Sequence, residues 1–137
     1  MAFGGFYGNI NFNDNVKKPG PVTIMSNGRY VGETVIAIEE RFPGRVVAVN
    51  RDMFKPDGSN LTDADIELDN IIIQVKSGSG KKLTDQIKRT ATGTKKTVIG
   101  YVPDLNPSSA LVKGVKAKGF EIFTKPEELM EYLIYNR

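Results

Sequence analysis

The segment from Asp65 to Lys76 most constrains the fold, because it has the pattern of a β-hairpin. Two strand-like runs flank Asp69-Asn70, a pair suited to a two-residue turn. Side chains alternate between the two faces of a sheet, so the pattern gathers polar groups on one face and apolar groups on the other. The polar set is Asp63, Asp65, Glu67, Gln74 and Lys76; the apolar set is Ala64, Ile66, Leu68, Ile71, Ile73 and Val75, with Ile72 as the exception.

The second strand of this hairpin, residues 71–75, is nearly all apolar, which is typical of a strand covered on both faces. Gln74 and Lys76 would then lie near the end of a central strand, where polar and charged groups need partners. A carboxylate, an amide and an ammonium side by side can hold a divalent cation and a phosphate. The alternative is an ordinary polar face in contact with water.

The residues after the hairpin are basic. Ser77-Gly78-Ser79-Gly80 forms a flexible turn, and a helix is expected from about Lys82 to Thr90. Residues 76–118 carry 10 basic and 2 acidic side chains, or +8, whereas residues 1–75 carry 7 and 10, or −3. A basic stretch beside carboxylates is the pattern expected of a phosphate-binding surface, although solvated lysines would give the same composition. The residues expected to contact a polyanion are Lys81, Lys82, Gln86, Lys88, Arg89 and Thr90.

These motifs resemble the PD-(D/E)xK nuclease superfamily, whose fold is that of the restriction endonucleases. The resemblance covers about residues 28–137 and matches Asp65 to the family's Asp, with Gln74 and Lys76 at the ends of its Glu-x-Lys element. Glu33 matches the carboxylate of the first helix, with Glu39 and Glu40 as alternatives. The resemblance implies an α/β fold in which helices flank a mixed central sheet. It departs from the family at Gln74, where a carboxylate is usual.

The resemblance also implies the chemistry of the site. Glu33, Asp65, the Gln74 oxygen and the Val75 carbonyl would bind Mg²⁺ or Mn²⁺, and the loss of one carboxylate indicates a single, weakly bound ion. Lys76 would orient the attacking water or stabilise charge on the transition state. The catalytic set implied is Glu33, Asp65, Gln74 and Lys76.

More narrowly, residues 72–78, 83–90 and 98–101 are similar to the C-terminal nuclease domains of contact-dependent growth inhibition toxins. That similarity implies a tRNase carried by a larger secreted bacterial effector. It would act in the cytoplasm of the target cell and be neutralised by a cognate immunity protein. A DNase of the same fold and a non-catalytic nucleic-acid-binding module are the alternatives.

Composition excludes several other kinds of chemistry. The 137 residues contain neither cysteine nor histidine, so disulfides, thiolate or histidine metal sites and Ser-His relays are absent. No run of about 18 apolar residues occurs, so we expect no membrane insertion by this domain. The stretch Gly78-Ser79-Gly80-Lys81 lacks the first glycine and the final hydroxyl residue of a Walker phosphate-binding loop.

The remaining elements follow from apolar periodicity and turn residues. We expect residues 1–27 to be an irregular arm or linker remnant and residues 28–137 to be one nuclease-like domain. Three further helices are expected. The first ends near Phe42, the second starts at Asn106-Pro107, and the third starts at a capping box formed by Thr124 and Glu127. The expected strands beyond the hairpin are residues 45–49, 97–102 and 120–123, and residues 50–63 are expected to form a polar loop.

Overall fold

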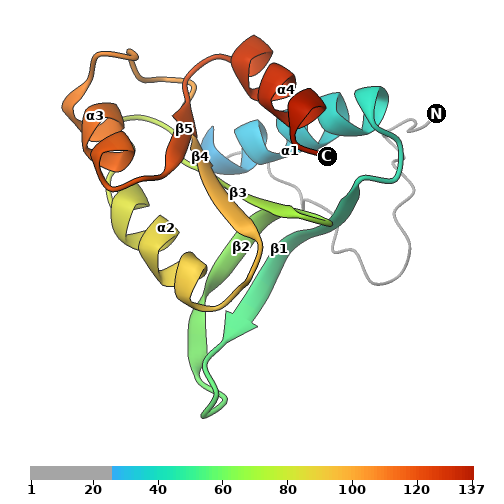
Figure 1. Ribbon diagram of the computed structural model, residues 1–137, viewed down its shortest axis with the longest axis vertical. Coiled ribbons are helices and arrows are strands. Elements are labelled where there is room, and N and C mark those ends of the chain that lie inside the picture. The colour runs from blue at the N-terminus through green and yellow to red at the C-terminus, as the bar shows by residue number, and fades with distance from the viewer. Residues whose placement is uncertain (1–25) are drawn as a thin grey trace.

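The computed structural model describes residues 26–137, with side chains from residue 28 onward, and forms an α/β fold in which helices flank a mixed five-stranded sheet (Figure 1). The predicted arm, residues 1–27, falls almost entirely outside these residues. Within residues 26–137, none of the helices has the length and apolar character needed to span a membrane. The helices are α1 (Ser26–Arg41), α2 (Leu83–Thr92), α3 (Ala110–Ala117) and α4 (Pro126–Tyr135); the strands are β1 (Val46–Phe54), β2 (Asn60–Leu68), β3 (Ile71–Val75), β4 (Thr97–Tyr101) and β5 (Glu121–Phe123).

The strands lie in the order β1-β2-β3-β4-β5. The two pairs β1–β2 and β2–β3 are antiparallel, whereas β3–β4 and β4–β5 are parallel and are joined through α2 and α3. The pairing of Ile66 with Ile73 and of Glu67 with Ile72 confirms the predicted turn at Asp69-Asn70. The central strand β3 is buried along its whole length, as its apolar sequence predicts.

Helices α1 and α4 cover one face of the sheet, and α2 and α3 cover the other (Figure 1). On the first face, Ile71, Ile73 and Val75 of β3 pack against apolar residues of α1 and α4. On the second face, Ile72 packs with Leu83 and Ile87 of α2 and with residues of α3. The alternation along β3 thus divides the apolar core into two clusters, one on each side of the sheet.

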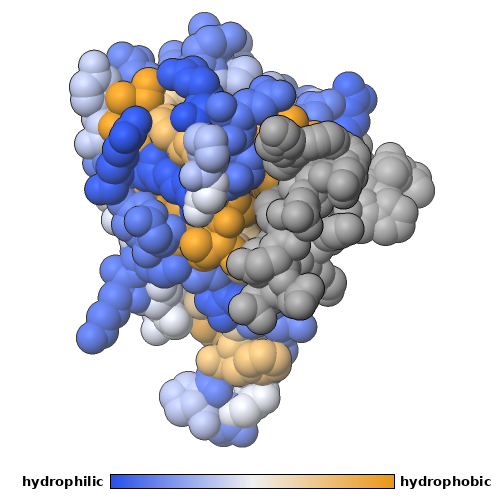
Figure 2. Space-filling model, turned by 90° about the vertical axis from the view of Figure 1, so that its right-hand side faces the viewer, coloured by the Kyte–Doolittle hydropathy of each residue, from blue (hydrophilic) through white to orange (hydrophobic). Residues whose placement is uncertain are grey.

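The predicted loop at residues 50–63 is wrong, because β1 and β2 continue through it as a long hairpin. Only a short turn remains, in which the main-chain N–H of Gly58 donates to the Lys55 carbonyl at 2.9 Å. The hairpin projects beyond the helices in Figure 1, and Figure 2 shows it as a narrow extension that carries some hydrophobic surface. Phe54, with 60% of its surface exposed, is the largest hydrophobic side chain exposed on this extension.

Two predicted helix starts are also wrong. Asn106 does not cap α3, because its side-chain oxygen accepts bonds from the N–H and hydroxyl of Ser108, and Ser109 caps the helix instead. Helix α4 begins at Pro126 after Lys125, and no side chain caps it, so the expected capping box does not form.

Candidate functional site

Beyond Ile66 and Ile73, strands β2 and β3 are held together by hydrogen bonds between side chains and the main chain. The main-chain N–H of Asp65 donates to Gln74 Oε1 at 3.0 Å. The main-chain N–H of Val75 donates to Asp65 Oδ2 at 2.8 Å. The carboxyl of Asp65 and the carboxamide of Gln74 therefore each replace a main-chain partner at the point where the two strands separate.

The same point interrupts the alternation of faces along β2. Ile66 packs in the core on the α1–α4 side, whereas Ala64, two residues earlier, packs on the α2–α3 side. The predicted placement of Ala64 on the same face as Ile66 is therefore wrong. Asn50 of β1 lies across from this point and has a positive φ of 55°, which few residues other than glycine adopt. At this point the side chains of β2 switch from one face of the sheet to the other. The switch leaves the main-chain N–H groups of Asp65 and Val75 available to the side chains of Gln74 and Asp65.

Gln74 is fully buried and connects the sheet to α2. Its Nε2 donates to the Asp63 carbonyl at 2.9 Å and to Thr90 Oγ1 at 2.7 Å. The Thr90 hydroxyl in turn donates to the Gln86 carbonyl at 2.6 Å. Both ends of the carboxamide are thus occupied by protein partners, so the network fixes the position of α2 against β2 and β3.

Gln86 adds a weak bond to this network, because its Nε2 lies 3.4 Å from the Asp63 carbonyl. Among the described residues, Gln86 Oε1 is a buried acceptor without a hydrogen-bond partner. Thr90 lies on the buried side of α2, where it bonds to Gln74 and is covered from solvent.

Asp65 is the titratable group of this site. Only 9% of its surface is exposed, and the loss of solvation raises the pKa of its carboxyl to about 6. The Val75 N–H and the positive charge of Lys76 oppose this rise, and Asp63 adds to it. A carboxyl that titrates near pH 6 can both accept and release a proton close to neutral pH.

Lys76 directly follows β3 and lies at its partly exposed end. Its main-chain N–H donates to the Tyr101 carbonyl at 3.1 Å, which continues the pairing with β4. Its charge acts on Asp65, so the structure brings together these two residues of the predicted catalytic set.

The structure does not bring Glu33 to this pair. Glu33 lies on the exposed side of α1, where Arg29 Nε donates to its Oε2 at 3.0 Å, and it is not among the charges that affect Asp65. Its alternative Glu39 accepts bonds from the N–H groups of Gly44 and Val46, both at 2.8 Å, and so closes the turn between α1 and β1. Glu40 is exposed on α1.

The donor set implied for Mg²⁺ or Mn²⁺ does not fit the described residues as they are arranged. The Gln74 oxygen is bonded to a main-chain N–H, and Glu33 lies elsewhere on α1. Across residues 26–137, no three acidic side chains gather in a way that could hold a metal ion. Asp65 and the Val75 carbonyl remain as donors, which are fewer than such ions usually receive. The metal ion therefore stays a prediction.

Glu67, on the predicted polar face, belongs to a separate ion-pair cluster. Its carboxylate is bound by Arg51 Nε at 2.5 Å and by Lys96 Nζ at 2.7 Å. Burial alone would raise the pKa of Glu67, but these two cations lower it. Lys96 Nζ also donates to the Leu68 carbonyl at 2.8 Å, so the cluster ties the start of β4 to β2.

The loop after Lys76 is held by a contact that the sequence did not predict. Asp104 accepts a hydrogen bond from the Gly78 N–H at 2.7 Å and another from the Tyr30 hydroxyl. These bonds lower the pKa of Asp104, with the Tyr30 bond as the larger cause. The contact joins α1, the β3–α2 loop and the segment after β4, and no local pattern in the sequence signals it.

The predicted polyanion contacts Lys81, Lys82, Lys88 and Arg89 are all exposed, at the start of α2 or along it.

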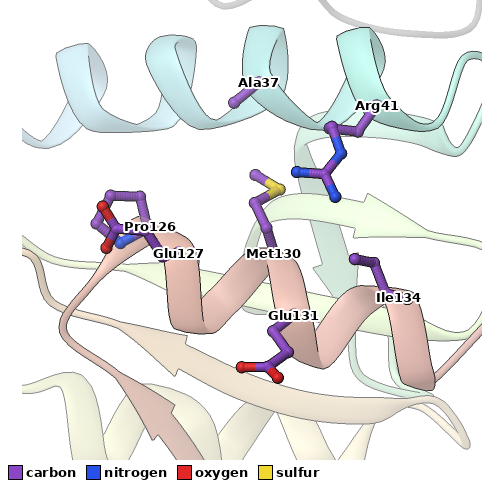
Figure 3. Close-up of a pocket in the computed structure, with 7 residues that line it drawn as sticks. All are labelled: Ala37, Arg41, Pro126, Glu127, Met130, Glu131 and Ile134. Atoms are coloured by element: carbon purple, nitrogen blue, oxygen red, sulfur yellow. The ribbon is translucent and has the colours of Figure 1, made fainter.

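A shallow groove of about 450 Å³ lies on the opposite side of the molecule, between α1 and α4 (Figure 3). Met130 projects from α4 toward Ala37, and Glu127, Glu131 and Arg41 line the groove. The groove is remote from Asp65, because the sheet separates α1 and α4 from α2.

No family model, curated protein or solved structure matches this chain. The resemblance to PD-(D/E)xK nucleases and to growth-inhibition toxins therefore stays a prediction based on the sequence motifs.

Proposed function

We propose that this domain is an endonuclease that hydrolyses phosphodiester bonds with Asp65 and Lys76 as its reactive pair. The observation that carries the proposal is the buried Asp65 carboxyl at the separation of β2 and β3, with a pKa raised to about 6 and with the charge of Lys76 acting on it. An acid of shifted pKa beside a cation is typical of sites that move protons on an anionic substrate.

In this proposal, the Asp65 carboxylate accepts a proton from the attacking water. The water oxygen forms a bond to phosphorus, the bond from phosphorus to the leaving oxygen breaks, and the leaving oxygen takes up a proton from solvent to become a hydroxyl. The Lys76 ammonium stabilises the negative charge that builds on the phosphate oxygens. Gln74 and the Val75 N–H hold the Asp65 main chain and carboxylate in place.

We propose tRNA as the substrate, and a toxin domain of a larger bacterial effector as the setting, on the strength of the sequence motifs. In that setting the domain would act in the target-cell cytoplasm and a cognate immunity protein would bind it. DNA is the alternative substrate of the same reaction.

A second candidate function is a nucleic-acid-binding module without catalysis. It is favoured by the fact that Gln74 and one oxygen of Asp65 are engaged in bonds that also stabilise the fold. In such a module these groups would be structural, and only the basic surface would be functional.

The test is cleavage of tRNA and of plasmid DNA by the purified protein, with Mg²⁺, with Mn²⁺ and with EDTA. Asp65→Asn and Lys76→Met are expected to lose cleavage. Glu131→Gln and Lys125→Met, which remove the same charges from exposed positions elsewhere, are expected to retain it. Cleavage that survives in Asp65→Asn refutes the assignment of the reactive pair, and binding without any cleavage by the wild type supports the second candidate.

A further inference from the structure

Helices α2 and α3 form one continuous layer over the same face of the sheet (Figure 1). Leu83 and Ile87 of α2 and Val112 and Val115 of α3 are buried in the same apolar cluster. The outward sides of α2 and α3 therefore face away from the sheet and form one surface.

This outer surface is strongly basic. Eight cations on or beside the two helices are exposed and only Asp85 opposes them, so 8 minus 1 gives +7. Among the described residues, none of the eight forms an ion pair, whereas Lys96 and Asp104 of the same segment are engaged elsewhere. The eight are Lys81, Lys82, Lys88, Arg89, Lys95, Lys113, Lys116 and Lys118.

The layer on the other side of the sheet has the opposite charge. Counted within the helices alone, α2 and α3 carry four cations and one aspartate, so 4 minus 1 gives +3, whereas the described side chains of α1 and α4 include two arginines and six glutamates, so 2 minus 6 gives −4. Figure 3 shows two of these glutamates on α4, Glu127 and Glu131. A polyanion is attracted to one helix layer and repelled by the other.

The basic layer also begins at the candidate site. Gln74 points from β3 to Thr90 of α2, and Lys76, two residues later, is expected on the same side of the strand. The loop from Ser77 to Gly80 then leads directly into Lys81 and Lys82. A strand of nucleic acid seated at Asp65 and Lys76 can therefore continue over this layer.

We propose that the substrate lies across both helices, so that α3 shares the phosphate contacts with α2 through Lys113, Lys116 and Lys118. This inference rests on the proposed function, and it adds to the contacts predicted from the sequence, all of which precede α3. Exposed lysines suit this role because they meet phosphates as point charges without reading the bases.

The test is the salt dependence of binding to fluorescein-labelled tRNA, measured by anisotropy between 50 and 200 mM KCl in the non-cleaving Asp65→Asn protein. Each phosphate contact contributes about 0.7 to 0.9 to the slope of log affinity against log salt. The double variant Lys113→Gln/Lys116→Gln should therefore have a slope smaller in magnitude by about 1.5 than that of the protein with both lysines. Between 50 and 200 mM KCl, the factor by which its affinity falls should be about tenfold smaller.

The matched control is Lys55→Gln/Lys125→Gln, which removes two exposed lysines outside the layer and should leave the slope unchanged. Equal slopes in the two double variants would overturn the inference, while cleavage by the wild type would still stand on its own assay. Binding to phosphatidylserine vesicles but not to tRNA would also overturn it. Circular dichroism of every variant keeps a loss of folding separate from a loss of contacts.

Discussion

Asp65→Asn should make the fold more stable at neutral pH while it removes the proposed catalytic base. The carboxyl of Asp65 is buried, and the loss of solvation disfavours its charged form. Asparagine has nearly the same shape and carries no charge. It keeps a side-chain oxygen that can accept the Val75 N–H.

The magnitude follows from the shift in pKa. The pKa of Asp65 rises from 3.8 in the unfolded chain to about 6 in the folded protein. Each pKa unit corresponds to about 1.36 kcal/mol, so the ionised carboxylate costs the fold up to about 3 kcal/mol. The new amide N–H groups need partners, and this requirement reduces the gain.

The sign of the pH dependence is fixed by the direction of the shift. Between about pH 4 and pH 6 the folded protein binds the Asp65 proton and the unfolded chain has lost it, so the free energy of unfolding falls as pH rises. Below this range Asp65 is protonated in both states. The difference between Asp65→Asn and wild type should therefore be smallest near pH 4 and greatest at pH 7.

Urea unfolding at several values between pH 4 and pH 8 measures this difference. Glu131→Gln, an exposed carboxylate on α4, serves as the control and should differ little from wild type across the range. An Asp65→Asn protein that is less stable than wild type at pH 7, or a difference that does not change with pH, would refute the reasoning.

Two further substitutions test the surroundings of the site. Gln74→Leu keeps the bulk of the side chain but leaves several buried partners of the carboxamide unpaired, at about 1 to 3 kcal/mol each. We therefore expect urea unfolding to show a free energy of unfolding lower by at least about 3 kcal/mol. A decrease below about 1 kcal/mol would contradict the role of the network. Gly80→Ala places a Cβ 2.6 Å from Leu111 Cδ2 at a φ of 70°, whereas Gly78→Ala, at a φ of 60°, meets no atom within 4 Å. Both changes incur backbone strain of about 1 kcal/mol. Gly80→Ala also forces the end of the Leu111 side chain to shift, so it should be the less stable of the two by about 1 kcal/mol on thermal unfolding; equal stabilities would show that the packing of the loop against α3 has no role.

The sequence predicted those elements whose signals are local. The turn at Asp69-Asn70 and the buried strand that follows it depend on apolar periodicity and turn residues, whereas the mixed sheet flanked by helices was implied by the family resemblance. The extension of β1 and β2 was missed because residues 50–63 are mostly polar. Their strand structure depends on pairing with each other, which polarity along one chain segment does not reveal.

The sequence predicted which residues form the candidate site but not how they are arranged. The hairpin pattern placed Asp65, Gln74 and Lys76 near one another, and the structure describes them so. The change of faces at Asp65 could not be foreseen, because strict alternation was the only available rule. The contact of Asp104 with Tyr30 and Gly78 joins three distant segments, and such contacts leave no periodic trace in a single sequence.

The opposite charges of the two helix layers have a consequence for how the molecule approaches its partners. The layers lie on either side of a sheet, and each helix layer is about 10 Å from the strands. At physiological ionic strength the Debye length is about 8 Å, which is shorter than the roughly 20 Å between the layers. A polyanion near α2 and α3 therefore responds to the local +7 and is screened from the acidic helices behind the sheet. The formal net charge of +3 thus understates the field that orients the encounter, and the molecule should meet an anionic polymer with one side rather than at random.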